Sequence, residues 1–215
     1  MPPPRRSAIT KKAYYSTMSL IDRKIGEILE VLKKTGQYDN TLIFFTSDHG
    51  DYMGEFGMFG KGQYLSESLT RIPLLMKPPV PGFRGMDCQD YAMNFDIAAT
   101  CISVAGKKDA IPDMAARDLS GYWEETKAND PPEVLYTEAL NVRAIQNKQW
   151  KLIYYQDRSY GELYHLEQDP VEKYNLFGKE EYREIQQMLL CRLCDKMIEL
   201  GRTSGSQWNY AAPVI

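Results

Sequence analysis

The sequence lacks an excess of positive charge and lacks any long apolar run. Its 215 residues carry a formal net charge of -3, with both signs well mixed, so no basic face for a phosphate backbone is expected. No stretch approaches the roughly 20 apolar residues of a membrane span, and the start, MPPPRRSAITKKAYY, lacks the apolar region of a signal peptide. We therefore expect no nucleic-acid partner and no membrane partner. The compartment stays open, because a signal peptide would lie upstream of residue 1.

Cysteine and histidine are also scarce. The four cysteines, Cys88, Cys101, Cys191 and Cys194, are too few and too scattered for a disulfide scaffold. Cys101 lies in the apolar run DIAATCISVAG and is predicted to be a buried free thiol. Cys191 and Cys194 form a C-x-x-C, but the surrounding segment is helical and no second Cys or His pair lies near it in sequence. We interpret them as ordinary helix cysteines.

Hydrophobic residues make up 43% of the chain, which is enough for a core. The first periodic segment predicts an amphipathic helix that ends near Gly36. Its apolar positions are Met18, Ile21, Ile25, Ile28, Leu29 and Leu32. The continuous run TLIFFTS follows, and it predicts a strand buried on both faces, as in a parallel sheet covered by helices. Helix, short turn and buried strand together favour an α/β fold.

The next hundred residues alternate between loops and short elements. Five glycines between residues 50 and 63 predict a loop that can adopt positive φ and approach a ligand closely. RIPLLMKPPV predicts a short strand stopped by prolines. MNFDIAATCISVAG predicts a helix with Asn94 as N-cap and Gly106 at its end. The polar stretch 107–133 predicts a surface connection.

Past residue 134 the sequence changes to short alternating runs. VLYTEAL, VRAIQN, WKLIYYQ and GELYHLEQDP are typical of antiparallel strands, and a helix is predicted over about 179–200. We therefore predict an α/β part over 1–133 and a small antiparallel α+β subdomain over 134–215.

Asp48 and His49 stand where the first strand runs out. Ligands gather outside the carboxyl ends of strands in open α/β sheets, and a carboxylate beside an imidazole suits Ca, Mg, Mn or Zn rather than a redox metal. The alternative is structural: Asp48 caps the following turn and His49 packs at a loop edge. Lys61, farther along the glycine-rich loop, has the equally ordinary interpretation of a solvated lysine.

Residues 47–79, SDHGDYMGEFGMFGKGQYLSESLTRIPLLMKPP, resemble the carboxyl-proximal motif of the sulfatase family in the alkaline phosphatase superfamily. Three further segments resemble the family in the right order: the helix and strand before the site, NFDIAATCISVAG, and ELYHLEQDPVEKYNL. The resemblance covers nearly the whole chain. It implies that Asp48 and His49 are ligands of a divalent cation, usually calcium, beside the sulfate. It also implies that Lys61 is the lysine that contacts the sulfate group.

The sequence departs from the family in three places. Phe56 replaces the histidine of the family's Gly-Glu-His-Gly, which puts the shape of the substrate pocket in question, and His165 replaces an aspartate at a position predicted to lie on the surface. The larger departure is that no cysteine or serine satisfies C/S-x-P-x-R, the motif that yields the formylglycine nucleophile. That motif and an early pair of aspartates normally precede the helix at Ala13. We therefore expect residue 1 not to be a natural start, and this chain alone to be inactive.

Three functions stay open from the sequence. The first is the C-terminal part of a sulfatase, a sulfuric ester hydrolase whose complete form acts on a sulfate ester, either a small molecule or a sulfated glycan. The second is a phosphonate monoester or phosphodiester hydrolase of the same superfamily. The third is a noncatalytic module that binds an anion or a partner. A truncated sheet would also expose apolar surface, which predicts self-association into a homo-oligomer.

Overall fold

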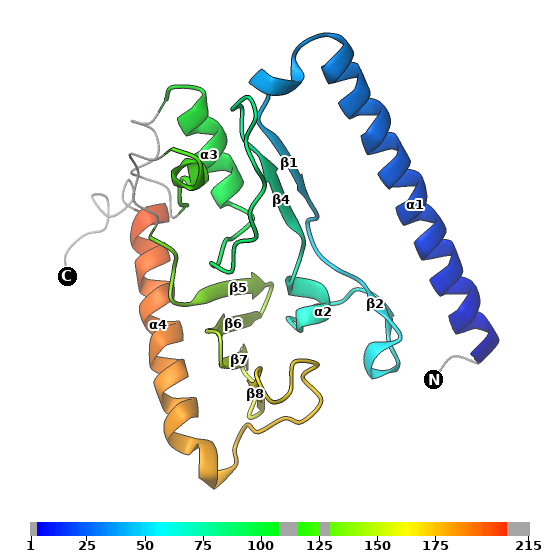
Figure 1. Cartoon of the computed structure of the whole chain (residues 1–215). Helices are drawn as coiled ribbons and strands as arrows, with labels where there is room; N and C mark the ends of the chain where they lie inside the picture. Colours follow the sequence, from blue (N-terminus) through cyan, green and yellow to red (C-terminus); the bar gives the residue numbers. More distant parts are fainter. Residues whose placement is uncertain (1–3, 108–115, 125–129, 206–215) are drawn as a thin grey trace. The chain divides into compact units, whose positions relative to one another are not determined.

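The chain forms two units, each with its own set of contacts. The computed structural model describes residues 4–107, 116–124 and 130–205 (Figure 1). The first unit comprises residues 1–62 and 68–88, and the second comprises residues 63–67 and 89–215. The chain thus enters the second unit for five residues, returns to the first, and enters the second again after Cys88. The structure is mixed α/β. The boundary at residue 133 stays a prediction.

The first unit contains one long helix, two pairs of short strands and short helical turns. Its elements are α1 (Pro4–Lys34), η1 (Tyr38–Asn40), β1 (Ile43–Thr46), β2 (Tyr52–Met53), η2 (Glu55–Gly57), β3 (Phe59–Gly60), most of α2 (Glu67–Thr70) and β4 (Leu74–Lys77). The predicted end of α1 is confirmed. Gly36 has φ 69°, the Gln37 N–H donates to Leu32 O at 2.9 Å, and the Gly36 N–H donates to Lys33 O at 3.1 Å, the two bonds of a Schellman C-cap.

β1 departs from the prediction of a strand buried on both faces. Ile43 and Phe44 are half-buried, whereas Phe45 and Thr46 are exposed. β1 pairs in antiparallel register with β4, and among the described residues this pair forms a sheet of two strands. No further strand therefore covers its second edge here, and its cross-strand apolar pair, Phe45 opposite Leu75, faces solvent.

The second unit is built on an antiparallel sheet of four strands in sequence order, as predicted from the alternating runs. The strands are β5 (Leu135–Ala139), β6 (Val142–Gln146), β7 (Trp150–Tyr155) and β8 (Gly161–His165). A short turn, η5 (Glu180–Tyr182), leads into α4 (Arg183–Gly205), which lies along this sheet in Figure 1. The predicted small antiparallel sheet with a C-terminal helix is confirmed.

Alternating side chains give the four-stranded sheet two packed faces. One face meets α4 through a cluster made of Ile145, Trp150, Leu152, Leu163, Leu189 and Leu193. The other face holds a second cluster, in which Leu65 packs with Val142, Ala144, Ile153 and Tyr164. Leu65 comes from the five-residue excursion 63–67. The second face of the sheet is therefore where that segment is anchored.

The helix predicted from MNFDIAATCISVAG is α3 (Asp96–Val104), and two details of that prediction are wrong. Phe95, not Asn94, occupies the N-cap position. Cys101 is exposed rather than buried, because it lies on the opposite face of α3 from the buried Ala99 and Ser103. The predicted end is confirmed: Gly106 has φ 76°, and its N–H donates to Ser103 O at 2.9 Å.

The stretch 107–133 contains a buried turn as well as surface residues. In η4 (Leu119–Tyr122), Leu119 and Ser120 are buried, and the Leu119 N–H donates to the Thr100 hydroxyl at 2.9 Å. The prediction of a surface connection is therefore wrong for this turn, while residues 108–115 and 125–129 lie outside the described residues. None of the helices in the described ranges combines the length and the hydropathy of a membrane span.

Candidate functional site

Asp48 and His49 lie in a tight turn directly after β1. The Ser47 hydroxyl donates to His49 O at 2.7 Å, and the His49 N–H donates to Asp48 Oδ1 at 3.0 Å. These local bonds fold the chain back on itself at the strand end. The Asp48 side chain is 85% exposed and the His49 side chain 33% exposed, so a ligand from solvent can reach the carboxylate.

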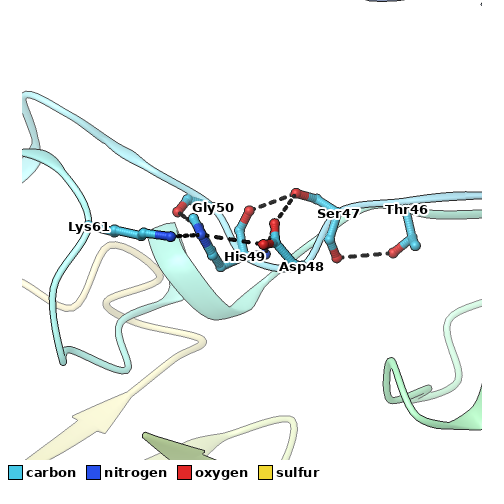
Figure 2. Close-up of polar contacts among 6 residues, drawn as sticks. All are labelled: Thr46, Ser47, Asp48, His49, Gly50 and Lys61. Carbon is cyan, nitrogen blue, oxygen red and sulfur yellow. Dashed lines mark hydrogen bonds and ion pairs between the residues drawn. The ribbon is translucent and has the colours of Figure 1, made fainter.

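Lys61 meets His49 across the glycine-rich loop. Figure 2 shows its side chain reaching the imidazole, with Lys61 Nζ 2.6 Å from His49 Nε2. The opposite ring nitrogen, Nδ1, lies 2.8 Å from Gly50 O. Because a carbonyl oxygen can only accept, Nδ1 carries the proton, and the neutral ring offers the lone pair of Nε2 to the Lys61 ammonium. The structure therefore brings together all three residues that the sequence analysis proposed for the site.

Glycines shape this loop at specific points. A Cβ on Gly50 would lie 2.0 Å from Ser68 O, and the Gly50 N–H donates to Leu69 O at 2.8 Å, so two backbone segments meet where no side chain fits. Gly60, directly before Lys61, has φ 77°, a conformation that glycine adopts without strain. The glycine-rich loop thus closes against the segment after residue 67 and turns just before Lys61.

Phe56, which replaces the histidine of the family motif, takes an uncommon conformation. Its φ is 52°, its side chain is 52% exposed, and its ring makes an edge contact with Tyr52 at a centroid distance of 6.0 Å. The aromatic ring therefore offers no polar group at the position where the family motif has an imidazole. His165 is half-buried and makes an edge contact with Trp150 at 4.4 Å, so it is a packing residue rather than a bare surface one.

The donor set of Asp48 and His49 fits one divalent cation in part. Two ligand bonds of about 2.1 and 2.4 Å at 90–110° would hold their donor atoms roughly 3.2–3.7 Å apart. His49 Nε2 and Asp48 Oδ2 are 3.6 Å apart. No cluster of three or more His, Cys, Asp or Glu side chains with a metal-binding arrangement occurs in the part of the chain that the structure describes. The pair therefore suits a cation, but further ligands would have to complete its coordination.

The electrostatics of the turn favour the carboxylate form of Asp48. The backbone N–H of His49 lowers the pKa of Asp48 below its ordinary value, and the positive charge of Lys61 adds to the effect. An ionised, exposed carboxylate is the form that binds a cation. The turn thus presents one negative oxygen pair, one imidazole lone pair and one ammonium within a few ångströms.

Comparison with known proteins assigns the chain to a family. Residues 54–199 match the family described as N-sulphoglucosamine sulphohydrolase, C-terminal, and the chain belongs to it. Over 190 residues the chain is 33% identical to an N-acetylglucosamine-6-O-sulfatase of Bacteroides thetaiotaomicron, covering 82% of this chain and 34% of that protein. It is 30% identical over 217 residues to an arylsulfatase of Clostridium perfringens, covering 95% of this chain and 44% of that protein.

A solved structure supports the same assignment. It shows a protein in complex with its substrate, D-glucosamine-2-N,6-O-disulfate, and it matches this chain with a TM-score of 0.74 at 28% identity. The match covers 87% of this chain and 40% of that one. The resemblance to the C-terminal region of a sulfatase, with relatives in the alkaline phosphatase superfamily, is therefore confirmed. The chain spans between a third and a half of the length of these relatives.

The sequence analysis missed the residues that hold the segment after Lys61. Leu65 and Glu67 from this segment are packed and ion-paired within the second unit. Glu67 and its neighbour Glu172 both lie in stretches that resemble the family, so the signal was present. The resemblance did not identify the contacts of these residues, because a motif match does not show which residues distant in sequence lie together in the fold.

Proposed function

We propose that this chain supplies the C-terminal part of a sulfatase site, with Asp48 and His49 as cation ligands and Lys61 as the contact to the sulfate group. The observation that supports this proposal best is the convergence of Asp48 Oδ2, His49 Nε2 and Lys61 Nζ at the end of β1. The order of the family motifs along the chain agrees with it. In the complete protein, the proposed substrate class is a sulfate ester, and the disulfated glucosamine bound by a relative favours a sulfated sugar.

Each side chain has a definite role in this proposal. The Asp48 carboxylate and the Nε2 lone pair of His49 hold a divalent cation, usually calcium in the family, which supplies polarisation of the sulfate oxygens. The Lys61 ammonium places a positive charge against the same anion. His49 Nε2 has one lone pair, so it would serve either Lys61 or a cation, and a bound cation would leave the Lys61 ammonium without its bond to His49. That ammonium is then free to meet the anion.

This chain alone carries no nucleophile of the family type, because no Cys or Ser in its sequence satisfies C/S-x-P-x-R. We therefore expect the 215-residue chain to hydrolyse no aryl sulfate above the level of a Lys61→Ala variant. Clear hydrolysis by the unaltered chain, lost in that variant, would contradict this part of the proposal.

The cation ligands can be tested without turnover, because the chain has only two histidines. In long-range ¹H–¹⁵N spectra of the imidazoles, Mn²⁺ should broaden the His49 signals at concentrations that leave His165 sharp. Asp48→Asn should weaken this selective broadening, and Asp51→Asn is a matched control two residues from His49. Equal broadening of both rings, or broadening of His49 that is indifferent to Asp48→Asn, would overturn the proposed ligand pair.

A further inference from the structure

A buried ion triad lies on the second face of the four-stranded sheet, away from the Asp48 turn in sequence. Lys151 Nζ, on β7, is 2.9 Å from Glu67 Oε1 and 2.8 Å from Glu172 Oε1. The exposed fractions of the three side chains are 1% for Lys151, 2% for Glu172 and 17% for Glu67. Removing three ionised groups from water is costly and is offset only by good mutual pairing. A buried cluster of this kind is therefore expected to have a specific structural role.

The triad holds a backbone as well as side chains. Glu172 uses its second oxygen, Oε2, to accept the backbone N–H of Glu67 at 2.7 Å, so one carboxylate bridges the lysine and the segment 63–67. Glu172 itself has φ 55°, a strained conformation for a residue with a side chain. The turn that contains Glu172 is fixed nearby: Asp169 Oδ2 accepts the Tyr174 N–H at 2.8 Å.

Apolar packing adds to this anchor. Leu65, two residues before Glu67, is 4% exposed in the cluster with Ile153 and Tyr164. Lys151 and Ile153 are two residues apart on β7, so their side chains lie on the same face of the sheet. Leu65 and the triad therefore pack on that one face. The short segment 63–67 is thereby held by a buried side chain, a buried ion pair and a backbone hydrogen bond.

The covalent chain connects this anchor to the candidate site at both ends. Lys61 lies two residues before the segment. After the segment, Leu69 O accepts the Gly50 N–H at 2.8 Å, and Gly50 follows His49 directly. Segment 63–67 therefore lies in the chain between Lys61, which contacts His49 Nε2, and Leu69, whose carbonyl oxygen holds the Gly50 N–H.

We propose that Lys151 and Glu172 are positioning residues for Lys61: through Glu67 they hold segment 63–67, which begins two residues after Lys61 in the chain, and so restrict the backbone conformations open to the loop that carries the Lys61 ammonium to His49 Nε2. This inference rests on the proposed role of Lys61. It assigns a function to the Glu172 turn of ELYHLEQDPVEKYNL that the sequence alone did not provide. In this proposal the triad acts on Lys61 through the backbone.

The test uses the whole 215-residue chain and its two imidazoles. Lys151→Met removes the cation that pairs with the Glu67 and Glu172 carboxylates and can prevent folding, so the main variant is charge-free: Glu67→Gln, Lys151→Met and Glu172→Gln together. Glu172→Gln alone is the milder second variant. Lys148→Met, at an exposed lysine in the turn before β7, is the matched control. Lys61→Met gives the reference spectrum of His49 without its partner.

In the charge-free variant we expect the Glu67 amide to exchange with solvent at least about tenfold faster, because a local opening is easier. The His49 Nε2 signal should move toward its position in Lys61→Met. Glu172→Gln should move it part of the way, and Lys148→Met should leave it unchanged.

Two results would overturn the inference, and they differ in what else they affect. If Lys61→Met shifts His49 but neither triad variant does, the triad is a structural anchor only and the proposed site stands. If Lys61→Met itself leaves His49 unchanged, the Lys61–His49 contact is wrong, and both the positioning role and the proposed role of Lys61 are lost.

Discussion

Two of the lysine-centred clusters among the described residues, one around Lys61 and one around Lys151, differ in their access to water. Lys61, Asp48 and His49 form an open cluster, in which the Asp48 side chain is 85% exposed. Lys151, Glu67 and Glu172 form a sealed cluster, in which the lysine is 1% exposed. Exposed charges lose little when a partner is exchanged for a ligand, whereas buried charges are held to one arrangement. The open cluster is therefore suited to binding, and the sealed cluster to positioning.

The largest predicted effect comes from breaking the sealed cluster. Lys151→Met should lower the free energy of unfolding by about 3–5 kcal/mol, because it removes the only lysine paired with the buried Glu172 and the partly buried Glu67 carboxylates in the described part of the chain. The charge-free triple variant should recover most of that loss. Urea denaturation followed by tryptophan fluorescence measures both. A Lys151→Met loss no larger than that of Lys148→Met would show that the triad carries little interaction energy.

A side chain at Gly50, next to the open cluster, should have the next largest effect on the free energy of unfolding. Gly50→Ala places a Cβ 2.0 Å from Ser68 O, and relief of this overlap should cost about 2–3 kcal/mol of unfolding free energy. Gly26→Ala is the matched control, since a Cβ on Gly26, within α1, meets nothing within 4 Å, and it should stabilise the helix by about 0.5–1 kcal/mol. Equal effects of the two alanines would refute the tight contact.

The sealed cluster should also make stability depend on pH. Burial raises the pKa of Glu172 above its ordinary value of 4.5, with Lys151 and the backbone N–H of Glu67 opposing the shift and the charge of the Glu67 carboxylate adding to it; Tyr164 also faces this carboxyl. The native state thus binds the Glu172 proton more tightly than the unfolded state. The resulting stabilisation is present below pH 4.5 and is lost as the pH rises through the native pKa.

Glu172→Gln removes this titration. The stability of the variant relative to the unaltered chain should therefore improve as the pH is raised from about 4.5. Urea denaturation of both proteins between pH 4 and pH 8 gives the difference directly. A difference that moves in the opposite direction would mean that Lys151, rather than burial, governs the ionisation of Glu172.

The smallest effect is expected on association. Phe45 and Leu75 are opposite each other on β1 and β4, and they are 39% and 64% exposed. We expect weak self-association through such surface, and Phe45→Ser with Leu75→Ser should reduce it. Sedimentation velocity over a concentration series is the measurement. A chain that stays monomeric at the highest concentration would remove this expectation.

The two clusters also differ in how well they could be predicted from the sequence. The open cluster was predictable, because Asp48, His49 and Lys61 lie within fourteen residues of one another in a stretch with a family motif. The sealed cluster was not predictable, because Glu67, Lys151 and Glu172 are far apart in sequence. They meet only because the turn after β8 and the segment 63–67 both pack beside β7. Helix ends were predicted through Gly36 and Gly106, since their left-handed conformation has a sequence signature.

The errors have the same physical origin. Cys101 and β1 were predicted to be buried because their neighbours are apolar, but local composition does not say what covers a surface. Burial depends on the tertiary partners that an element meets. Asn94 was predicted as an N-cap from residue type, whereas α3 begins one residue later, after Phe95.

The measurement that tests the contrast most directly is competitive acetylation of the native chain, with each lysine quantified by mass spectrometry. Lys61 should react at a rate similar to that of the exposed Lys148, and Lys151 should react only after unfolding. Mn²⁺ should speed the reaction of Lys61 by taking the His49 lone pair, and should leave Lys148 unchanged. A native Lys151 that reacts like Lys148, or a Lys61 whose reaction is indifferent to Mn²⁺, would contradict the account.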